Sequence, residues 1–122
     1  MEIKYKIWIE ENGKVIFDKG RYNILKAIDK NFSLKGAVKE LGISYRWAWD
    51  KLVVSQETME LYLVETGTKG KYLQLTPLAR TIMDRFEKQE NDVEKLLQTE
   101  SQDFQKLIRD AKNNSRLEKS QY

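Results

Sequence analysis

Four residues near the middle of the chain combine planar aromatic rings with a guanidinium group. They are Tyr45, Arg46, Trp47 and Trp49, and they directly follow a Gly-Ile-Ser stretch. A hydrophobic core can use the aromatic rings but excludes a charged arginine beside them. A surface that meets a planar and negatively charged partner can use all four side chains. The residue types and their spacing therefore predict a binding surface.

The composition excludes most catalytic and metal-binding chemistry. The 122 residues include no cysteine and no histidine, which removes disulfides, nucleophilic thiols, imidazole bases and nearly all zinc sites. The sequence has no Walker-type phosphate loop and no pair of acids that stands out, so we expect no enzyme, metal site, cofactor or small-molecule site. No apolar run approaches the ~20 residues of a membrane span and no signal-peptide core follows Met1, which predicts a cytoplasmic protein without membrane contacts.

The length and charge indicate where a partner would bind. The chain is long enough for one domain with an appended helix. Because 34% of the residues are charged and 40% are hydrophobic, the core should be modest, and a larger buried surface would need a second copy. Residues 1–83 carry 14 Lys and Arg against 10 Asp and Glu, whereas residues 84–122 carry 8 against 9. An anionic ligand should therefore bind to the first two thirds of the chain.

Hydrophobic periodicity predicts the elements that precede the four residues. Residues 3–10 alternate between apolar and polar, as in a strand with one buried face, and the alternation resumes over residues 15–17. The Asn-Gly pair at 12–13 is a strong hairpin signal because both turn positions favour a positive φ. Asp18 can then cap a helix that runs to about residue 30.

Two short helices joined at a glycine come next. Ser33 can cap the first helix, which ends at Gly42, and Ser44 can cap the second, predicted over residues 44–54. Ile43 would fill the space inside the turn between them. This pattern predicts a helix-turn-helix whose second helix carries the four residues.

A second hairpin with a polar tip follows the helix-turn-helix. Residues 61–63 lead into one strand and residues 72–75 form the other. The loop 66–71 between them contains two glycines and two lysines. In position and character this hairpin is a wing.

The last element is a long helix that opens with Thr76-Pro77, a capping residue followed by proline at the first helical position. Its apolar residues recur with an 11-residue period, about 3.67 residues per turn, which is typical of a nearly straight helix. Residues 78–86 can pack on the domain. Beyond residue 90, this stripe of apolar residues extends past any surface that a small domain could offer. We therefore predict that helix 77–112 dimerises, with residues 113–122 disordered. The dimerisation residues are Phe86, Val93, Leu97, Phe104 and Ile108.

Residues 1–86 resemble the DNA-binding domain of the ModE family of bacterial and archaeal regulators, which is related to the LysR type. The sequence GISYR at 42–46 with AWD at 48–50 is similar to that family's GISY[KR]xAWD, and residues 64–70 resemble its wing. The resemblance implies an α+β fold: a winged helix-turn-helix domain over residues 1–76, with an N-terminal β-hairpin and a long C-terminal dimerisation helix. The wing is shorter than the family's. Nothing resembles the family's molybdate-binding domains, so oxyanion sensing is not carried over.

On this fold, helix 44–54 enters the major groove and wing 66–72 contacts the DNA backbone or the minor groove. Arg46 is the best candidate for reading a base, because a guanidinium can form two hydrogen bonds with guanine. Helix N-termini favour phosphate, which adds the two capping serines. The expected DNA contacts are Ser33, Lys35, Ser44, Tyr45, Arg46, Trp47, Trp49, Lys51, Thr68, Lys69 and Lys71.

Several of these residues have a plainer structural interpretation. The two serines would cap helices in a protein that never meets DNA. Trp49 is adjacent to Ala48 on the packing face and is better placed for the core than for contact, whereas Trp47 points away from that face. Tyr45 fits either interpretation, and Lys51 could simply be a solvated lysine.

The expected function is binding of double-stranded DNA as a homodimer, most simply by a transcriptional regulator associated with the nucleoid. An architectural chromatin protein would use the same elements with little base reading, although such a protein usually has a larger basic excess. A winged helix that binds proteins is the third possibility, and the Tyr45-Arg46 edge argues against it.

Overall fold

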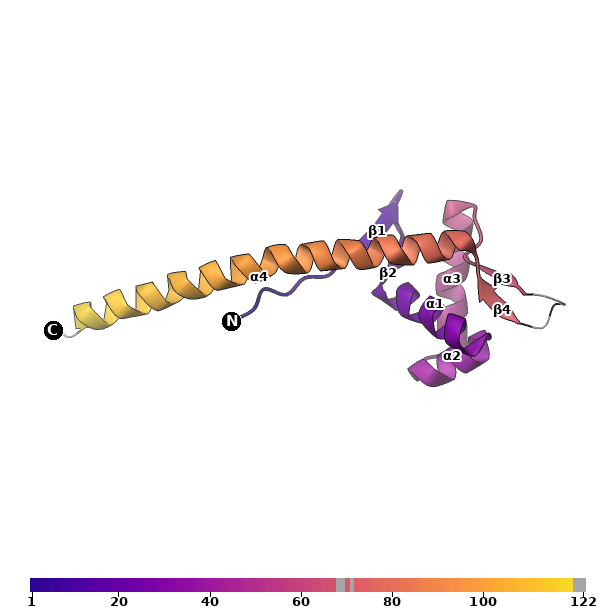
Figure 1. The fold of residues 1–122 in the computed structure, drawn as a ribbon, viewed down its shortest axis with the longest axis horizontal. Coiled ribbons are helices and arrows are strands. Elements are labelled where there is room, and N and C mark those ends of the chain that lie inside the picture. Colours follow the sequence, from indigo (N-terminus) through magenta and orange to yellow (C-terminus); the bar gives the residue numbers. More distant parts are fainter. Residues whose placement is uncertain (68–69, 71, 120–122) are drawn as a thin grey trace. The chain divides into compact units, whose positions relative to one another are not determined.

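The structure of the chain is a computed structural model, and it describes residues 1–67, 70 and 72–119. The chain divides into two compact units. One is Ile7–Phe86, and the other combines Met1–Lys6 with the chain from Glu87 onward. Figure 1 shows the α+β set of elements. They are β1 (Trp8–Glu11), β2 (Lys14–Asp18), α1 (Lys19–Asn31), α2 (Leu34–Leu41), α3 (Tyr45–Met59), β3 (Val64–Thr66), β4 (Leu73–Leu75) and α4 (Pro77–Lys119).

The first hairpin forms around the predicted Asn-Gly turn, but its first strand is shorter than expected. Asn12 and Gly13 have φ values of 50° and 79°, which confirms the turn. Strands β1 and β2 pair antiparallel from Trp8↔Asp18 to Glu11↔Lys14. The prediction of a strand from residue 3 was wrong. Helix α1 begins immediately after Asp18, so the residues before Trp8 have no strand beside them to pair with.

Helix α1 begins and ends close to where the sequence predicts. The Asp18 side chain accepts a hydrogen bond from the backbone N–H of Arg21 at 2.9 Å, which confirms it as the N-cap. At the other end, Phe32 adopts the left-handed conformation and donates its backbone N–H to the carbonyl of Ile28 at 2.7 Å. This hydrogen bond satisfies one of the last carbonyls of the helix.

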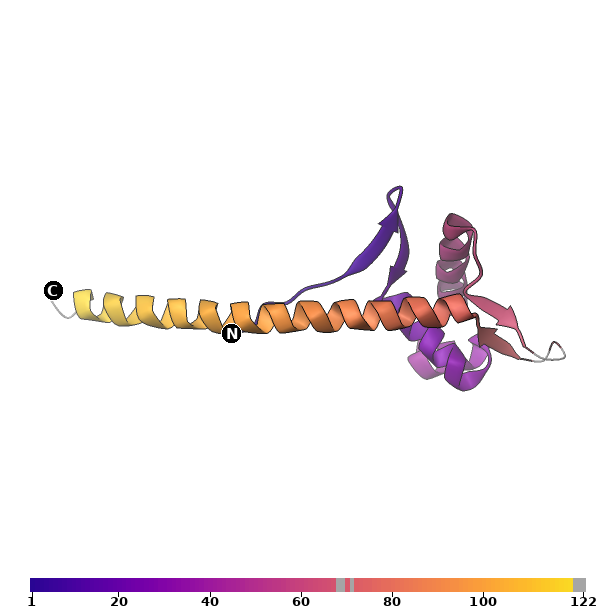
Figure 2. The ribbon, with the colours of Figure 1, turned by 45° about the horizontal axis from the view of Figure 1, so that its top comes forward.

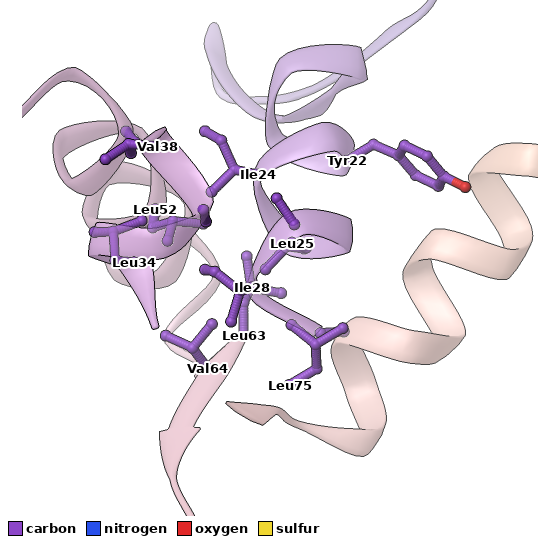
Figure 3. Close-up of a cluster of buried hydrophobic side chains, with 14 of the residues drawn as sticks. Tyr22, Ile24, Leu25, Ile28, Leu34, Val38, Leu52, Leu63, Val64 and Leu75 are labelled. Carbon is purple, nitrogen blue, oxygen red and sulfur yellow. The ribbon is translucent and has the colours of Figure 1, made fainter. Parts of the chain in front are cut away.

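The core of the Ile7–Phe86 unit lies around α1. Figure 3 shows Ile24, Leu25 and Ile28 of this helix among side chains from α2, α3 and the β3–β4 hairpin. The Tyr22 ring points toward α4 (Figure 3), where the centre of the Phe86 ring lies 6.1 Å away. Phe17 packs edge-on against the same Phe86 ring at 5.2 Å.

Phe86 is therefore a core residue of its own domain. Its side chain is 0% exposed, so it offers no surface to a second copy. Its assignment to dimerisation is corrected by this burial, whereas the packing of residues 78–86 on the domain agrees with the structure.

The second hairpin pairs Val64 with Leu75 and Thr66 with Leu73. In Figure 2 the two strands of each hairpin lie side by side. The Gly67 N–H donates to the carbonyl of Tyr72 and so continues the pairing beyond the strands. Residues 61 and 62, which were expected to lead into the first strand, lie outside it and are exposed.

Helix α4 begins at Pro77, and the Thr76 hydroxyl accepts from the N–H of Ala79 at 3.1 Å. The helix continues to Lys119, so the prediction that it ends at residue 112 and is followed by disorder was wrong over residues 113–119. Residues 120–122 lie outside the described residues. Once a helix is formed, each added residue gains a hydrogen bond. An asparagine such as Asn113 or Asn114 costs only about 0.7 kcal/mol relative to alanine.

The second unit combines the start of the chain with the later turns of α4. The Ile3 N–H donates to the Ser101 hydroxyl at 3.0 Å, and the Tyr5 hydroxyl donates to the carbonyl of Glu90 at 3.1 Å. The later residue, Tyr5, bonds to the earlier position on the helix, Glu90, so residues 1–6 run antiparallel to this part of α4.

Candidate nucleic-acid interface

The turn between α2 and α3 is built from local hydrogen bonds. Gly42 ends α2 in the left-handed conformation with a φ of 66°, which glycine adopts without steric cost. The Ile43 N–H donates to the carbonyl of Val38 at 3.1 Å. Ile43 itself is half-buried and packs against the core, as expected for the residue that fills the turn.

Both capping serines are confirmed. The Ser33 hydroxyl accepts from the N–H of Gly36 at 2.9 Å, and the Ser44 hydroxyl accepts from the N–H of Trp47 at 3.2 Å. Each hydroxyl keeps its own O–H to donate. The caps also fix where each helix starts, and so fix the direction in which its first N–H groups point.

Helix α3 buries one face and exposes the other. Ala48, Leu52 and Ser55 are fully buried against the domain. Tyr45 and Arg46 are exposed in the first turn. The helix runs to Met59, beyond the predicted end at residue 54, because its later turns still have core to pack against.

Trp49 is exposed, and its placement in the core was wrong. Its side chain is 43% accessible. Successive residues of an α-helix are rotated by about 100°, so a residue next to buried Ala48 lies at the margin of the packing face. Trp49 therefore joins Tyr45 and Arg46 on the outward side.

Trp47 is exposed, as predicted, but it also leans on the start of α1. A Cβ added at Gly20 would lie 3.5 Å from the Trp47 ring, which is an ordinary van der Waals distance. The Lys51 ammonium lies 5.4 Å from the centre of the same ring, within the range of a cation–π contact. Lys51 is half-buried and not simply a solvated lysine.

Arg46 has an acidic neighbour on the same helix. Its Nε lies 3.7 Å from Oδ2 of Asp50, one turn further along α3. Both side chains are largely exposed, so the pair contributes little stability. It leaves the terminal nitrogens of Arg46 facing solvent.

Two polar networks that the sequence did not reveal hold α3 in place. Arg21 is buried and donates from Nε to the Ser55 hydroxyl and from Nη1 to Oδ2 of Asp18 at 3.0 Å. The Gln56 side-chain carbonyl accepts from the N–H groups of Leu63 and Val64 at 2.9 and 3.2 Å. The first network ties α3 to the start of α1 and the second ties it to β3. The Asp-x-x-Arg spacing at 18–21 is the only sequence signal for either.

Of the other residues expected to contact DNA around α3, only some lie in the part of the chain that the structure describes. Lys35 is exposed in the first turn of α2, where a phosphate could approach. Thr68, Lys69 and Lys71 lie outside the described residues. Of the loop 66–71 that contains them, Thr66, Gly67 and Gly70 are described, and Gly70 has a φ of 67°.

The apolar stripe of α4 remains accessible beyond Phe86. Val93, Leu97 and Ile108 are half-buried, and Phe104 is 48% exposed. Two further apolar residues of this surface were not predicted. Leu96 and Leu107 are also exposed, and their 11-residue separation follows the period that revealed the others.

The described part of the chain has neither a cluster of metal-ligating side chains nor a membrane-spanning helix. No group of three or more Asp and Glu side chains within it could hold a metal ion. None of its helices is long and apolar enough to span a membrane.

No protein-family model matches the chain. Curated proteins that are similar to it include the DNA-binding transcriptional dual regulator ModE of Escherichia coli K12 and the transcriptional regulators ModE of Escherichia coli O157:H7 and Shigella flexneri. Each is 32% identical over 71 residues, or 58% of this chain. The chain spans only 27% of the length of these relatives. The similarity supports a relationship to DNA-binding regulators.

Proposed function

We propose that the protein binds double-stranded DNA as a homodimer and regulates transcription, with a winged helix-turn-helix as its reading unit. The observation that carries this proposal is the first turn of α3. Its capped start presents Tyr45, Arg46 and Trp49 to solvent, while the opposite face is held in the core. A rigid helix with an exposed N-terminal edge is what major-groove reading requires. The regulatory role is also named for the proteins that the chain resembles.

In this proposal Arg46 reads a base. A guanidinium that forms two hydrogen bonds with guanine contributes about 1–3 kcal/mol of discrimination. The 3.7 Å contact with Asp50 is too weak to hold the arginine in place, so Arg46 can turn toward a base when DNA binds.

Phosphate contacts come from the elements around α3. The capped starts of α2 and α3 offer N–H groups and a partial positive charge, and Lys35 lies in the first turn of α2. Thr68, Lys69 and Lys71 follow the backbone or the minor groove. These contacts position α3 and carry little sequence information.

The charges of α3 favour a regulator over an architectural protein. Asp50 and Glu57 are exposed on the same helix as Arg46, and Glu60 is exposed at the C-cap of that helix. Carboxylates close to DNA weaken binding unless a base amino group pairs with them. A protein that coats DNA without sequence preference would be better served by lysines at these positions.

The second copy binds through α4. Leu96, Phe104 and Leu107 are exposed, and Val93, Leu97 and Ile108 are only half-buried. This apolar surface is of the kind that a second copy can cover. Pairing of two such helices sets two reading helices about 34–36 Å apart, one turn of DNA. Binding to chromosomal DNA, on this proposal, places the protein in the cytoplasm in association with the nucleoid.

A binding selection on random duplex DNA tests the proposal. The full chain should enrich a near-palindromic motif with two half-sites about one helical turn apart. Light scattering at micromolar concentration should give twice the 14.5 kDa chain mass. Enrichment of no motif would contradict base reading, and a mass of one chain would contradict the dimer.

A further inference from the structure

Two exposed aromatic rings meet between the end of α1 and the β3–β4 hairpin. The centres of the Phe32 and Tyr72 rings are 5.9 Å apart with an angle of 61° between the planes. The side chains are 53% and 58% exposed, so their contact leaves most of both rings in water. Neither belongs to the core of the domain.

The backbone at Phe32 is in a conformation that phenylalanine does not favour. Its φ is 58°, a region where glycine or asparagine is the usual residue at the end of a helix. An exposed phenylalanine at a left-handed position therefore points to a role for its ring.

The pair is held by the elements on both sides. The Leu73 N–H donates to the carbonyl of Phe32 at 3.0 Å, and the carbonyl of Tyr72 accepts from Gly67. Phe32 directly precedes Ser33, the cap of α2, and Tyr72 belongs to the hairpin. The two rings thus lie between the two elements that the proposed function places on the DNA backbone.

Resting on that proposed function, we propose that Phe32 and Tyr72 together form an aromatic wedge that contacts the minor groove beside the site read by α3. Rings placed against a base step widen the groove and partly unstack the step. Pyrimidine–purine steps such as TA open easily, whereas runs of adenine are stiff and narrow. The wedge therefore selects deformable DNA at positions where no hydrogen bond reads a base.

The test compares two duplexes of the same composition, each about 30 base pairs long, or three helical turns. One alternates T and A along each strand, and the other has all its adenines on one strand. The full-length protein should bind the alternating duplex about tenfold more tightly, as measured by fluorescence anisotropy. Phe32→Gly and Tyr72→Leu should each lose most of this preference and about tenfold in affinity for the alternating duplex.

Stability separates a functional ring from a structural one. Because glycine suits the backbone of residue 32, Phe32→Gly should unfold at the same temperature as the wild type or higher while it binds DNA more weakly. Glu60→Gly is the matched control. Glu60 has the same φ of 58°, and its backbone N–H donates to the carbonyl of Gln56. Glu60→Gly therefore relieves the same backbone strain but removes no aromatic ring. Trp8→Leu removes an exposed aromatic ring from the first hairpin and should leave the duplex preference unchanged.

The outcomes distinguish this inference from the proposed function. Tight binding by the wild type, with the duplex preference unchanged in both Phe32→Gly and Tyr72→Leu, overturns the wedge alone. A wild-type protein that binds neither duplex at low salt overturns DNA binding, and the wedge with it. If Phe32→Gly lowers the unfolding temperature and Tyr72→Leu keeps the preference, the pair is a structural contact and the inference is wrong.

Discussion

Phe86 and Leu97 occupy the same face of α4, 11 residues apart, yet their surroundings differ. Phe86 is fully buried between Phe17 and Tyr22. Leu97 is only half-buried, and nearby Phe104 is 48% exposed. A continuous apolar period thus identifies which face of a helix will be covered, but it does not identify what covers it.

The two positions should contribute to stability in different ways. Burial of Phe86 within one chain stabilises the domain at any protein concentration. If the stripe around Leu97 is covered by a second copy, as we propose, its contribution depends on protein concentration through mass action. Substitutions that separate these two contributions test the comparison directly.

Phe86→Ala should have the largest effect. Removal of a buried phenylalanine leaves a cavity and lowers the free energy of unfolding by about 3–5 kcal/mol. Urea denaturation followed by circular dichroism measures the loss, which should be the same when the protein is diluted tenfold. Phe86→Leu retains most of the volume and should lose less. A loss that grows on dilution would show that Phe86 acts at a subunit interface.

Leu97→Asp combined with Phe104→Asp should separate the two copies while the domain stays folded. Unpaired charges in a buried seam are costly, and loss of linkage between half-sites should weaken DNA binding about 100-fold or more. Light scattering and anisotropy measure the two effects. Thr99→Asp with Asn113→Asp adds the same charge at exposed positions off the stripe, and this control should remain dimeric. A double variant that still dimerises would refute the proposed seam.

Arg46→Ala tests the proposed reading of bases by the first turn of α3 and leaves α4 unchanged. The variant should lose about 1–3 kcal/mol of discrimination at one or two base pairs per half-site and keep its dimer mass. Competition between the selected site and singly substituted sites measures this loss. Lys35→Ala should instead weaken binding to all sequences alike. If Arg46→Ala behaves in the same uniform way, Arg46 contacts only phosphate.

Lys69→Ala with Lys71→Ala should weaken binding to every sequence. Each lost phosphate contact lowers the slope of log K against log salt by about one. Titrations at several salt concentrations measure the slope, with Lys112→Ala on α4 as a control outside the domain. An unchanged slope would mean that the hairpin tip does not touch DNA.

Glu40→Gln should have the smallest effect, which is a small loss of stability of the Ile7–Phe86 unit. Its hydrogen bond with Lys30, at 2.6 Å, lowers the pKa of the Glu40 carboxyl below its usual 4.5. A lowered pKa stabilises the folded state above pH 4.5, and this contribution is lost as the pH falls through the folded value. Wild type and variant should therefore differ slightly in unfolding temperature at pH 7 and not at pH 2.5. A difference that persists in acid would exclude the ion pair as its cause.

The sequence predicted the element order well and the exposure of single side chains less well. The caps at Ser33 and Ser44 and the Asn12-Gly13 turn were found because each depends on residues within three positions of one another. The burial of Trp49 was predicted wrongly because it depends on how far the side chains packed around α1 extend over the surface of α3. The networks of Arg21 and Gln56 join segments that are distant in the sequence, so no local pattern reveals them.

The sequence by itself determined where helices start, where hairpins turn and which faces are apolar, since these features follow from backbone geometry and local hydrogen bonding. Only the tertiary structure decided that Phe86 is buried inside the domain, that Trp47 leans on Gly20 and that Phe32 meets Tyr72. The physical reason is that burial is a property of pairs of surfaces. A periodic pattern describes one surface, and the partner surface is set by how the whole chain folds.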